Sequence, residues 1–483
     1  MNTMRKTGVD QTLKYLILVL IVFLACTSVV IMSSGSAIAS GAAVTVNGAT
    51  TYEVIDGFGV NVNTAWWQKG AYGNTDTLKP AIDMLINDLG ATIVRAVIEE
   101  MDWEAVNDDP DPRHFNWSYF NEVFTSARFQ GVWNTLRYLN QRGIRDRLVI
   151  GFMGTPPSWM GDNYAISTTM EDEFVETIAA FLYYARHTEG IQFTLVSPMN
   201  ETEQVLKGWY EGPNMTDAVQ FGRVLTKLAV KLDAIGMNDI RFVAPDAASQ
   251  SFFQSLLSEM VKDPLIMSKL YCWGVHNYGK DSGGYNNFIS GSASQNKSFW
   301  VTETCDIANL FGQLDDNARA YIYWDGFDSV YQHAIRHDSR WTTPPNDWCY
   351  WMKTDVGKPL IAYNWSTNSW APRKQFYEHA QLFKYIVPGA VRIGATVNNR
   401  KLAVYAYRNP DGRVVIVGRS TASGAISVNG TLSSVNASPT LGFTYTTPTQ
   451  NMMKGAAVSV NDTGAFSVTV PGNCVFTLSG GRD

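Results

Sequence analysis

Residues 57–386 alternate short apolar runs with longer amphipathic stretches, and this alternation limits the fold more than any other feature of the chain. Repeated strand-then-helix units are typical of a parallel sheet that is covered by helices. The apolar runs predict eight strands, at 57–61, 93–97, 147–152, 193–196, 241–244, 271–275, 299–302 and 348–351. Amphipathic stretches predict helices at 77–89, 174–187, 215–235, 318–337 and 373–385. We therefore predict an α/β fold with a (β/α)8 TIM barrel over residues 57–386.

The sequence on both sides of this region indicates a second, all-β domain. Residues 387–483 alternate apolar and polar positions between Gly, Asn and Ser turns, which is typical of a β-sandwich. Residues 40–56 hold two short strands around Asn47-Gly48, which favours a hairpin. Because an isolated hairpin is unstable, we expect these strands to contribute to the sandwich. The sandwich as an independent carbohydrate-binding module is the alternative, and the shared N-terminal strands favour a structural role.

The first 39 residues have the pattern of an export signal. Basic residues precede an apolar run at 15–32, and Ala37-Ile38-Ala39 resembles a peptidase site. We predict a signal peptide at 1–39 and a secreted protein that begins at Ser40. The apolar run approaches the length of a membrane span, so an uncleaved anchor is a less favoured alternative.

Composition narrows the class of ligand. The formal net charge is −6, and the region after the signal has no run of Lys or Arg, which argues against nucleic acid as a partner. With 5 cysteines the chain has too few for a disulfide scaffold, and no Cys/His cluster has zinc spacing. We expect no metal or organic cofactor and see no sign of an obligate protein partner. A neutral polymer fits this composition better.

Two glutamates end two of the predicted strands. Glu201 follows the run at 193–199, and Glu303 follows the run at 299–302. The carboxyl ends of barrel strands meet at one face, so the two carboxyl groups are expected to lie close together. Hydrolysis of a glycosidic bond needs such a pair, one group to protonate the leaving oxygen and one to stabilise or capture the sugar carbon.

Seven spaced motifs resemble those of the retaining glycosidases of clan A, and most of all glycoside hydrolase family 30. They span almost the whole chain after the signal. They are Ile55-Asp56-Gly57-Phe58-Gly59, the stretch 155–160, the stretch 197–201, His276-Asn277-Tyr278, Thr302-Glu303, the stretch 348–351 and the stretch 387–393. This resemblance implies a barrel with a flanking sandwich and a carbohydrate substrate with β-linked sugars.

The resemblance also implies roles for single residues. Glu201 would be the general acid/base and Glu303 the nucleophile of a double displacement. Asn200 would contact the hydroxyl beside the anomeric carbon, and Arg95 would keep Glu303 ionised. The further substrate-binding residues would be His276, Tyr278, Trp351, Trp159, Trp66, Trp103 and Trp209, of which the loop tryptophans would stack on sugar faces. Core packing is the alternative for each aromatic residue, and structural pairing is the alternative for Arg95 and His276.

Two stretches depart from the family pattern. Thr202-Glu203 stands where proline commonly follows the acid/base, so an additional carboxylate lies beside Glu201. Glu99 and Glu100 are expected to disfavour acidic substrates by like-charge repulsion, which argues against recognition of glucuronic acid.

We predict a secreted retaining β-glycosidase that hydrolyses a neutral β-linked polysaccharide or oligosaccharide. Two alternatives stay open, a non-catalytic glycan-binding protein on a glycosidase fold and an exo-acting enzyme on small glycosides. The sugar, the linkage and the choice between endo and exo action depend on loops that the sequence does not define.

Overall fold

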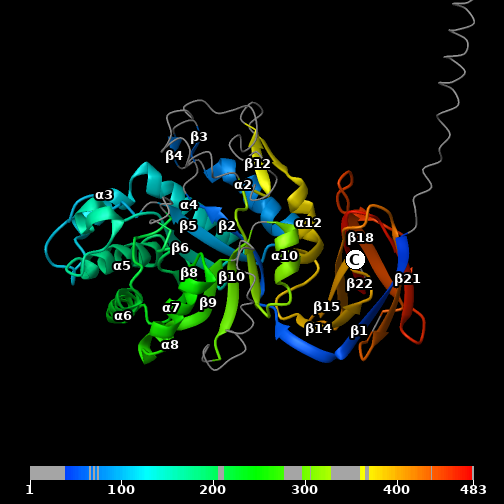
Figure 1. Cartoon of the computed structure of the whole chain (residues 1–483). Coiled ribbons are helices and arrows are strands. Elements are labelled where there is room, and N and C mark those ends of the chain that lie inside the picture. The colour runs from blue at the N-terminus through cyan, green and yellow to red at the C-terminus, as the bar shows by residue number, and fades with distance from the viewer. Residues whose placement is uncertain are drawn as a thin grey trace, which may run out of the picture.

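The structure is a computed structural model, and it describes residues 39–64, 67–68, 71–72, 75–99, 101–204, 211–276, 296–304, 306–327, 359–364, 369–436 and 438–480. Two parts lie side by side in Figure 1, a helix-covered barrel and an all-β domain. This architecture confirms the predicted fold class. The alternative membrane anchor and all of the predicted signal peptide except its last residue, Ala39, lie outside the described residues. Among the helices that the structure describes, none is long and apolar enough to cross a bilayer.

Parallel strands close the barrel, in the order β10-β11-β2-β5-β6-β7-β8-β9. In chain order they are β2 (Gly57–Asn63), β5 (Ile93–Glu99), β6 (Leu148–Met153), β7 (Leu195–Ser197), β8 (Arg241–Ala247), β9 (Leu270–His276), β10 (Ser298–Thr304) and β11 (Ala320–Tyr323). Strands β2 and β6 are buried at every position, as expected where helices cover one face and the barrel interior covers the other. Side chains such as Ile93, Val149 and Trp300 fill the interior, so the barrel is a packed core and not a pore.

The eighth barrel strand differs from the prediction. Strand β11 pairs with β10 and β2, and it lies inside the stretch 318–337 for which we predicted a helix. All four of its residues are fully buried, so they form a continuous apolar run with no alternation. Periodicity alone does not separate such a run from a buried helix. The stretch 348–351, our predicted eighth strand, lies outside the described residues.

Helices and small sheets surround the barrel. The helices are α2 (Thr75–Asp83), the π-helical turn η1 (Met84–Leu89), α3 (Trp117–Phe124), α4 (Ala127–Gln141), η2 (Ser158–Met160), η3 (Asp162–Tyr164), α5 (Glu171–His187), α6 (Ala218–Ala234), α7 (Gln250–Met260), α8 (Pro264–Lys269), α10 (Ile307–Gln313) and α12 (Lys374–Phe383). Two-stranded sheets are formed by β3 (Trp67–Gln68) with β4 (Ala71–Tyr72) and by β12 (Ile361–Asn364) with β13 (Ser369–Pro372). These helices agree with four of the predicted ones to within a few residues, and 318–337 is the exception.

A 10-stranded sheet forms the second domain. Its strands are β1 (Ala39–Val54), β14 (Val391–Val397), β15 (Leu402–Arg408), β16 (Val414–Ser420), β17 (Ile426–Ser433), β18 (Thr440–Thr446), β19 (Met453–Lys454), β20 (Val458–Ser459), β21 (Ala465–Val470) and β22 (Cys474–Gly480). A bridge between Val460 and Phe466 joins the region after β20 to β21, so the sheet curls around a core of its own.

The N-terminal segment enters this sheet in a different form from the predicted hairpin. Strand β1 is one continuous strand that pairs antiparallel with β14 and parallel with β17. A register shift between Asn47 and Thr51 occupies the place of the expected turn. Asn-Gly permits a bulge as well as a turn, and neighbours on both sides of β1 keep the strand extended through it. Because β1 leads directly into β2, one segment ties the two domains together (Figure 1).

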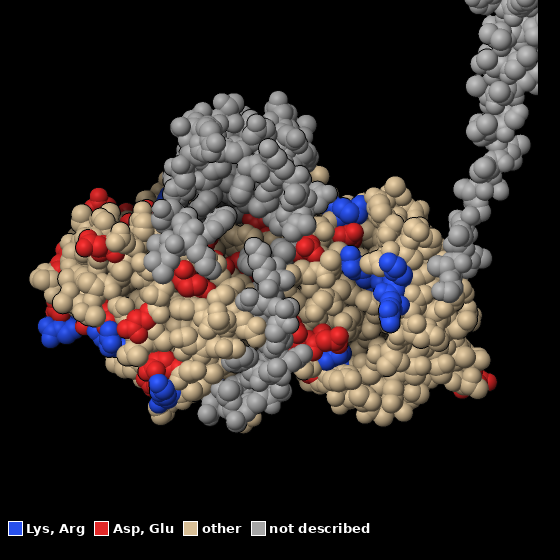
Figure 2. Space-filling view, viewed as in Figure 1, with Lys and Arg blue, Asp and Glu red and all other residues tan. Residues whose placement is uncertain are grey.

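Buried polar contacts connect the domains. Gln381 of α12 donates a hydrogen bond to Thr446 of β18 at 3.1 Å. The Tyr385 hydroxyl also donates to Thr444, at 3.0 Å. These contacts hold α12 between the barrel and the sheet, which favours a structural role for the sheet domain. On the face shown in Figure 2, charged side chains are scattered among uncharged ones, and the sheet domain is largely uncharged.

Candidate active site

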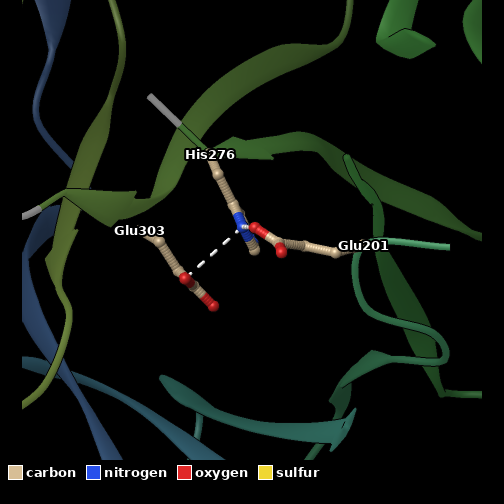
Figure 3. Close-up of side chains that lie close together, drawn as sticks. All are labelled: Glu201, His276 and Glu303. Carbon is tan, nitrogen blue, oxygen red and sulfur yellow. Dashed lines mark hydrogen bonds and ion pairs between the residues drawn. The ribbon is translucent and has the colours of Figure 1, made fainter. Parts of the chain in front are cut away.

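Five side chains of the predicted site meet at the carboxyl end of the barrel. Arg95 lies on β5, Asn200 and Glu201 directly follow β7, His276 ends β9, and Glu303 lies near the end of β10. All five are buried. Figure 3 shows that Glu201, His276 and Glu303 point toward one another. The barrel therefore brings together residues that are far apart in the sequence.

The two glutamates are close to each other and to one imidazole. His276 Nδ1 lies 2.6 Å from Glu201 Oε1 and 3.4 Å from Glu303 Oε2. One carboxylate oxygen of each glutamate and a nitrogen of His276 lie within 4.8 Å of one another. Burial lowers the pKa of His276, although Glu303 and Asp246 act in the opposite direction. A neutral His276 can bond a carboxyl group without adding a charge to the site.

Arg95 organises the floor of the site. Its Nη1 donates to Glu303 Oε1 at 3.0 Å and to Asn61 Oδ1 at 2.9 Å. Its Nη2 donates to Asn200 Oδ1 at 2.6 Å and lies 3.1 Å from Asp246 Oδ2. A buried guanidinium that is hydrogen-bonded to a carboxylate stabilises the ionised form of that carboxylate. The geometry therefore agrees with the expected support of Glu303.

The backbone around Glu201 is tightly constrained. Glu201 has a φ of 41°, and its N–H donates to the carbonyl oxygen of Asp246 at 3.0 Å. A Cβ on Gly212 would lie 1.7 Å from the Asn200 carbonyl oxygen, so only glycine permits the loop at 211–214 to pack on this turn. A non-glycine residue at positive φ is strained, and such strain occurs mostly at functional sites.

Glu203 clamps the neighbouring loop. Its Oε1 accepts hydrogen bonds from the backbone N–H groups of Ala248 at 2.8 Å and Ser249 at 3.1 Å. These groups directly precede α7, so the carboxylate fixes the loop that leads into that helix. Burial raises the pKa of Glu203. The additional carboxylate that departs from the family pattern thus joins the turn after β7 to the loop after β8.

Sequence reasoning missed two residues of this site. Asn61 lies near the end of β2 and Asp246 near the end of β8, and both contact Arg95. A polar residue at the end of an apolar strand is the available signal, and we applied it only to the glutamates. The predicted fifth strand stopped at residue 244, two positions before Asp246, because proline at 245 reads as a strand end.

The predicted aromatic residues have different outcomes. Trp159 is half-buried in η2, and its Nε1 donates to the Glu104 carbonyl oxygen at 2.8 Å. Its contact with sugar remains a prediction. Trp103 is 3% exposed and packs against Phe129, Phe152 and Phe181, which corrects its predicted place in the cleft. Its apolar ring is stabilised more by this core than by a solvated loop. Tyr278, Trp351, Trp66, Trp209 and Glu100 lie outside the described residues, as does the side chain of Glu99.

A carboxyl cluster holds the segment after β5 against α5. It consists of Glu104 and Asp108 from that segment and of Glu173 and Glu176 from α5. Glu104 accepts a hydrogen bond from Thr177, and both Glu176 oxygens are buried without a hydrogen-bond partner in the described structure. Burial raises the pKa of Glu104 to about 8 and, with the nearby Asp108 charge, that of Glu176 to about 9. Both groups are therefore protonated in the folded protein at neutral pH.

The carboxyl cluster predicts a loss of stability at alkaline pH. The folded state holds these protons up to a pKa of about 8 or 9 and the unfolded state only to about 4.5, so the free energy of unfolding falls as pH rises between these values. We expect Glu176→Gln to leave stability near pH 5 almost unchanged and to raise it near pH 8.5 by on the order of 2 kcal/mol. Urea unfolding at both pH values measures the difference. Glu122→Gln, at an exposed position of α3, is the matched control, and equal pH slopes in all three proteins would contradict the prediction.

Comparison with known proteins identifies the class. Residues 389–478 match the glycosyl hydrolase family 30 beta sandwich domain. Glucuronoxylanase XynC of Bacillus subtilis (strain 168) is 22% identical over 466 residues, which cover 93% of this chain and 94% of the relative.

Solved structures show the same architecture. The family 30 subfamily 8 xylanase Xyn30A of Clostridium acetobutylicum superposes with a TM-score of 0.65 at 20% identity, covering 91% of this chain and 99% of that one. The endo-β1,6-glucanase BT3312 superposes with a TM-score of 0.61 at 16% identity, covering 91% of this chain and 94% of that one. Together with the matches above, the barrel and its sheet domain define a glycoside hydrolase. Within that class the protein is a family-30-like enzyme of clan A.

Proposed function

We propose that the protein is a secreted enzyme that hydrolyses a neutral β-linked glycan with retention of anomeric configuration. Glu303 acts as the nucleophile and Glu201 as the general acid/base. The observation that carries this proposal is the spacing of the pair, since oxygens of the two carboxyl groups lie within 4.8 Å of each other. Retaining enzymes hold these groups about 5–5.5 Å apart, and inverting enzymes need about 6.5–9.5 Å to admit a water molecule.

Two displacements complete the reaction. In the first, the Glu303 carboxylate attacks the anomeric carbon while Glu201 gives its proton to the leaving oxygen, so the glycosidic bond breaks and a glycosyl ester forms. In the second, Glu201 takes a proton from a water molecule, which attacks the same carbon and releases Glu303. Two inversions give net retention, and both glutamates return to their starting protonation states.

The surrounding contacts support these roles. Arg95 at 3.0 Å favours an ionised Glu303, as a nucleophile requires. Asn200 accepts from Arg95 through Oδ1 and donates through Nδ2 to the Glu211 carbonyl oxygen at 3.2 Å. Its Nδ2 has a second hydrogen to donate, which we assign to the sugar hydroxyl beside the anomeric carbon. His276 bonds the acid/base at 2.6 Å and orients it between the two steps.

The substrate class follows from composition and relatives. A formal net charge of −6 disfavours a strongly acidic polymer as the substrate. The relatives are named as a glucuronoxylanase and an endo-β1,6-glucanase. We therefore place a neutral β-glycan first and a glucuronic-acid-bearing xylan second. Export through residues 1–39 agrees with a polymer that is found outside the cell.

A substrate panel tests the proposal. Residues 40–483 would be incubated with linear xylan, glucuronoxylan, β-1,6-glucan, β-1,6-galactan and aryl β-glycosides, and the products would be separated by anion-exchange chromatography. We expect soluble products from at least one neutral β-glycan. Release from glucuronoxylan alone would overturn the preference for a neutral substrate. Binding without any product across the panel would favour the non-catalytic alternative.

A further inference from the structure

Asp246 is a third carboxylate beneath the catalytic pair. It lies near the end of β8 and is fully buried. Its Oδ1 accepts a hydrogen bond from Thr302 Oγ1 at 2.5 Å, and its Oδ2 accepts one from Ser197 Oγ. A Cβ on Gly274 of β9 would lie 2.5 Å from Oδ1, so the carboxylate packs directly against that strand. Three neighbouring strands therefore fix one negative charge in place.

This charge shares a single cation with the proposed nucleophile. Arg95 Nη2 lies 3.1 Å from Asp246 Oδ2, and Arg95 Nη1 lies 3.0 Å from Glu303 Oε1. The three side chains are almost completely inaccessible to solvent. In such an environment charges are poorly screened, so the field of one carboxylate reaches the others. The positive charge of Arg95 is divided between two anions, and it neutralises neither of them fully.

The backbone of Asp246 also reaches the proposed acid/base. Its carbonyl oxygen accepts the Glu201 N–H at 3.0 Å, and Glu201 and Asp246 both have positive φ, 41° and 53°. The two turns that end β7 and β8 thus brace each other. A change at Asp246 is therefore expected to affect both Glu201 and Glu303.

We propose that Asp246 is a positioning residue whose fixed negative charge, shared through Arg95, sets the pH window in which Glu201 and Glu303 are active. This inference rests on the proposed function, since it presupposes those two roles. A nearby anion makes every neighbouring acid harder to ionise. Asp246 therefore holds both limbs of the pH–rate profile at higher pH than the glutamates and Arg95 alone would give.

Other titratable groups also lie near this position, and a test must leave them in place. They are Arg95 from β5, Glu201 and Glu203 after β7, His276 and Cys272 from β9, and Glu303 from β10. Asp246→Asn removes the charge and keeps the shape. The amide oxygen can remain on Arg95 while the amide nitrogen donates to Thr302.

The measurement is the pH dependence of kcat/KM for wild type and Asp246→Asn. We expect both limbs of the profile to move to lower pH by about one unit, the effect of removing one poorly screened charge at this range. Asp246→Ser, a second neutral variant of smaller size, is expected to move the limbs in the same direction. Ser197→Ala removes a hydrogen bond to Asp246 but keeps the charge, so its limbs are expected to stay in place.

The outcomes separate a charge effect from a packing effect. Lower activity with unmoved limbs in both neutral variants would overturn the proposal and leave Asp246 as a structural residue. Limbs that move to higher pH would also overturn it. If Glu303→Gln keeps its turnover, the proposed function has failed. If Glu303→Gln is inactive and the limbs of Asp246→Asn do not move, only this inference has failed.

Discussion

Glu303→Gln is expected to lower kcat/KM by roughly 10⁴-fold or more, because an amide cannot form the glycosyl ester on which the first displacement depends. Glutamine has the same size and can still accept a hydrogen bond from Arg95, so the fold should persist. Removing one of the buried carboxylates that share Arg95 also relieves repulsion between Glu303 and Asp246. The measurement is the initial rate on the best substrate of the panel, together with circular dichroism and the thermal midpoint.

A surface variant provides the control for this experiment. Glu122→Gln makes the same chemical change at an exposed position, and its rate should equal that of wild type. Turnover by Glu303→Gln within tenfold of wild type would remove Glu303 from the nucleophile role. Equal glycan binding by the two proteins with no turnover in either would favour the non-catalytic alternative.

Glu201→Ala is expected to lower kcat/KM on a polysaccharide by roughly 10²–10⁴-fold, the usual contribution of general acid catalysis. The loss should be much smaller for an aryl glycoside whose leaving group is a weak base, since that group departs without a proton. Hydrolysis of the glycosyl ester then becomes slow because no base activates the water. Added azide, which needs no base, should restore the rate and yield a β-glycosyl azide.

The azide product separates the two carboxylate roles. A β-azide places Glu201 on the side of the leaving group and leaves Glu303 as the nucleophile. An α-azide from Glu201→Ala would mean that the two roles are exchanged. No rescue, with equal losses on both types of substrate, would mean that Glu201 is not the acid/base.

The barrel was predictable because its strands are apolar along most of their length. Seven of the predicted strands agree with β2 and β5–β10 to within about three residues, since a parallel strand that is buried on both faces is a nearly continuous apolar run. The same property hid β11, whose four buried residues read as part of a helix. The turn at Asn47 was misjudged for a different reason, because the long-range pairing of β1 with β14 and β17 outweighs a local turn signal.

Site residues that belong to a chemical motif were predictable from the sequence. Residues whose role depends on the fold were not. Glu201, Glu303 and His276 ended recognisable runs, and the barrel brings them together. Asp246 has no motif, and it matters only because strands from four parts of the chain close around Arg95. Trp103 shows the opposite case, since its place in an expected loop hid a core contact with Phe181. The position of a residue along the chain does not show whether its side chain is buried in the core.

The stereochemistry of the first product tests the retaining mechanism most directly. Proton NMR would follow the anomeric signals of the newly formed reducing end during the first minutes of hydrolysis, before mutarotation mixes the two forms. With oxygens of Glu201 and Glu303 within 4.8 Å, we predict that the β anomer appears first and the α anomer later. An α anomer at the start would contradict the double displacement, and with it the role of Glu303 as nucleophile.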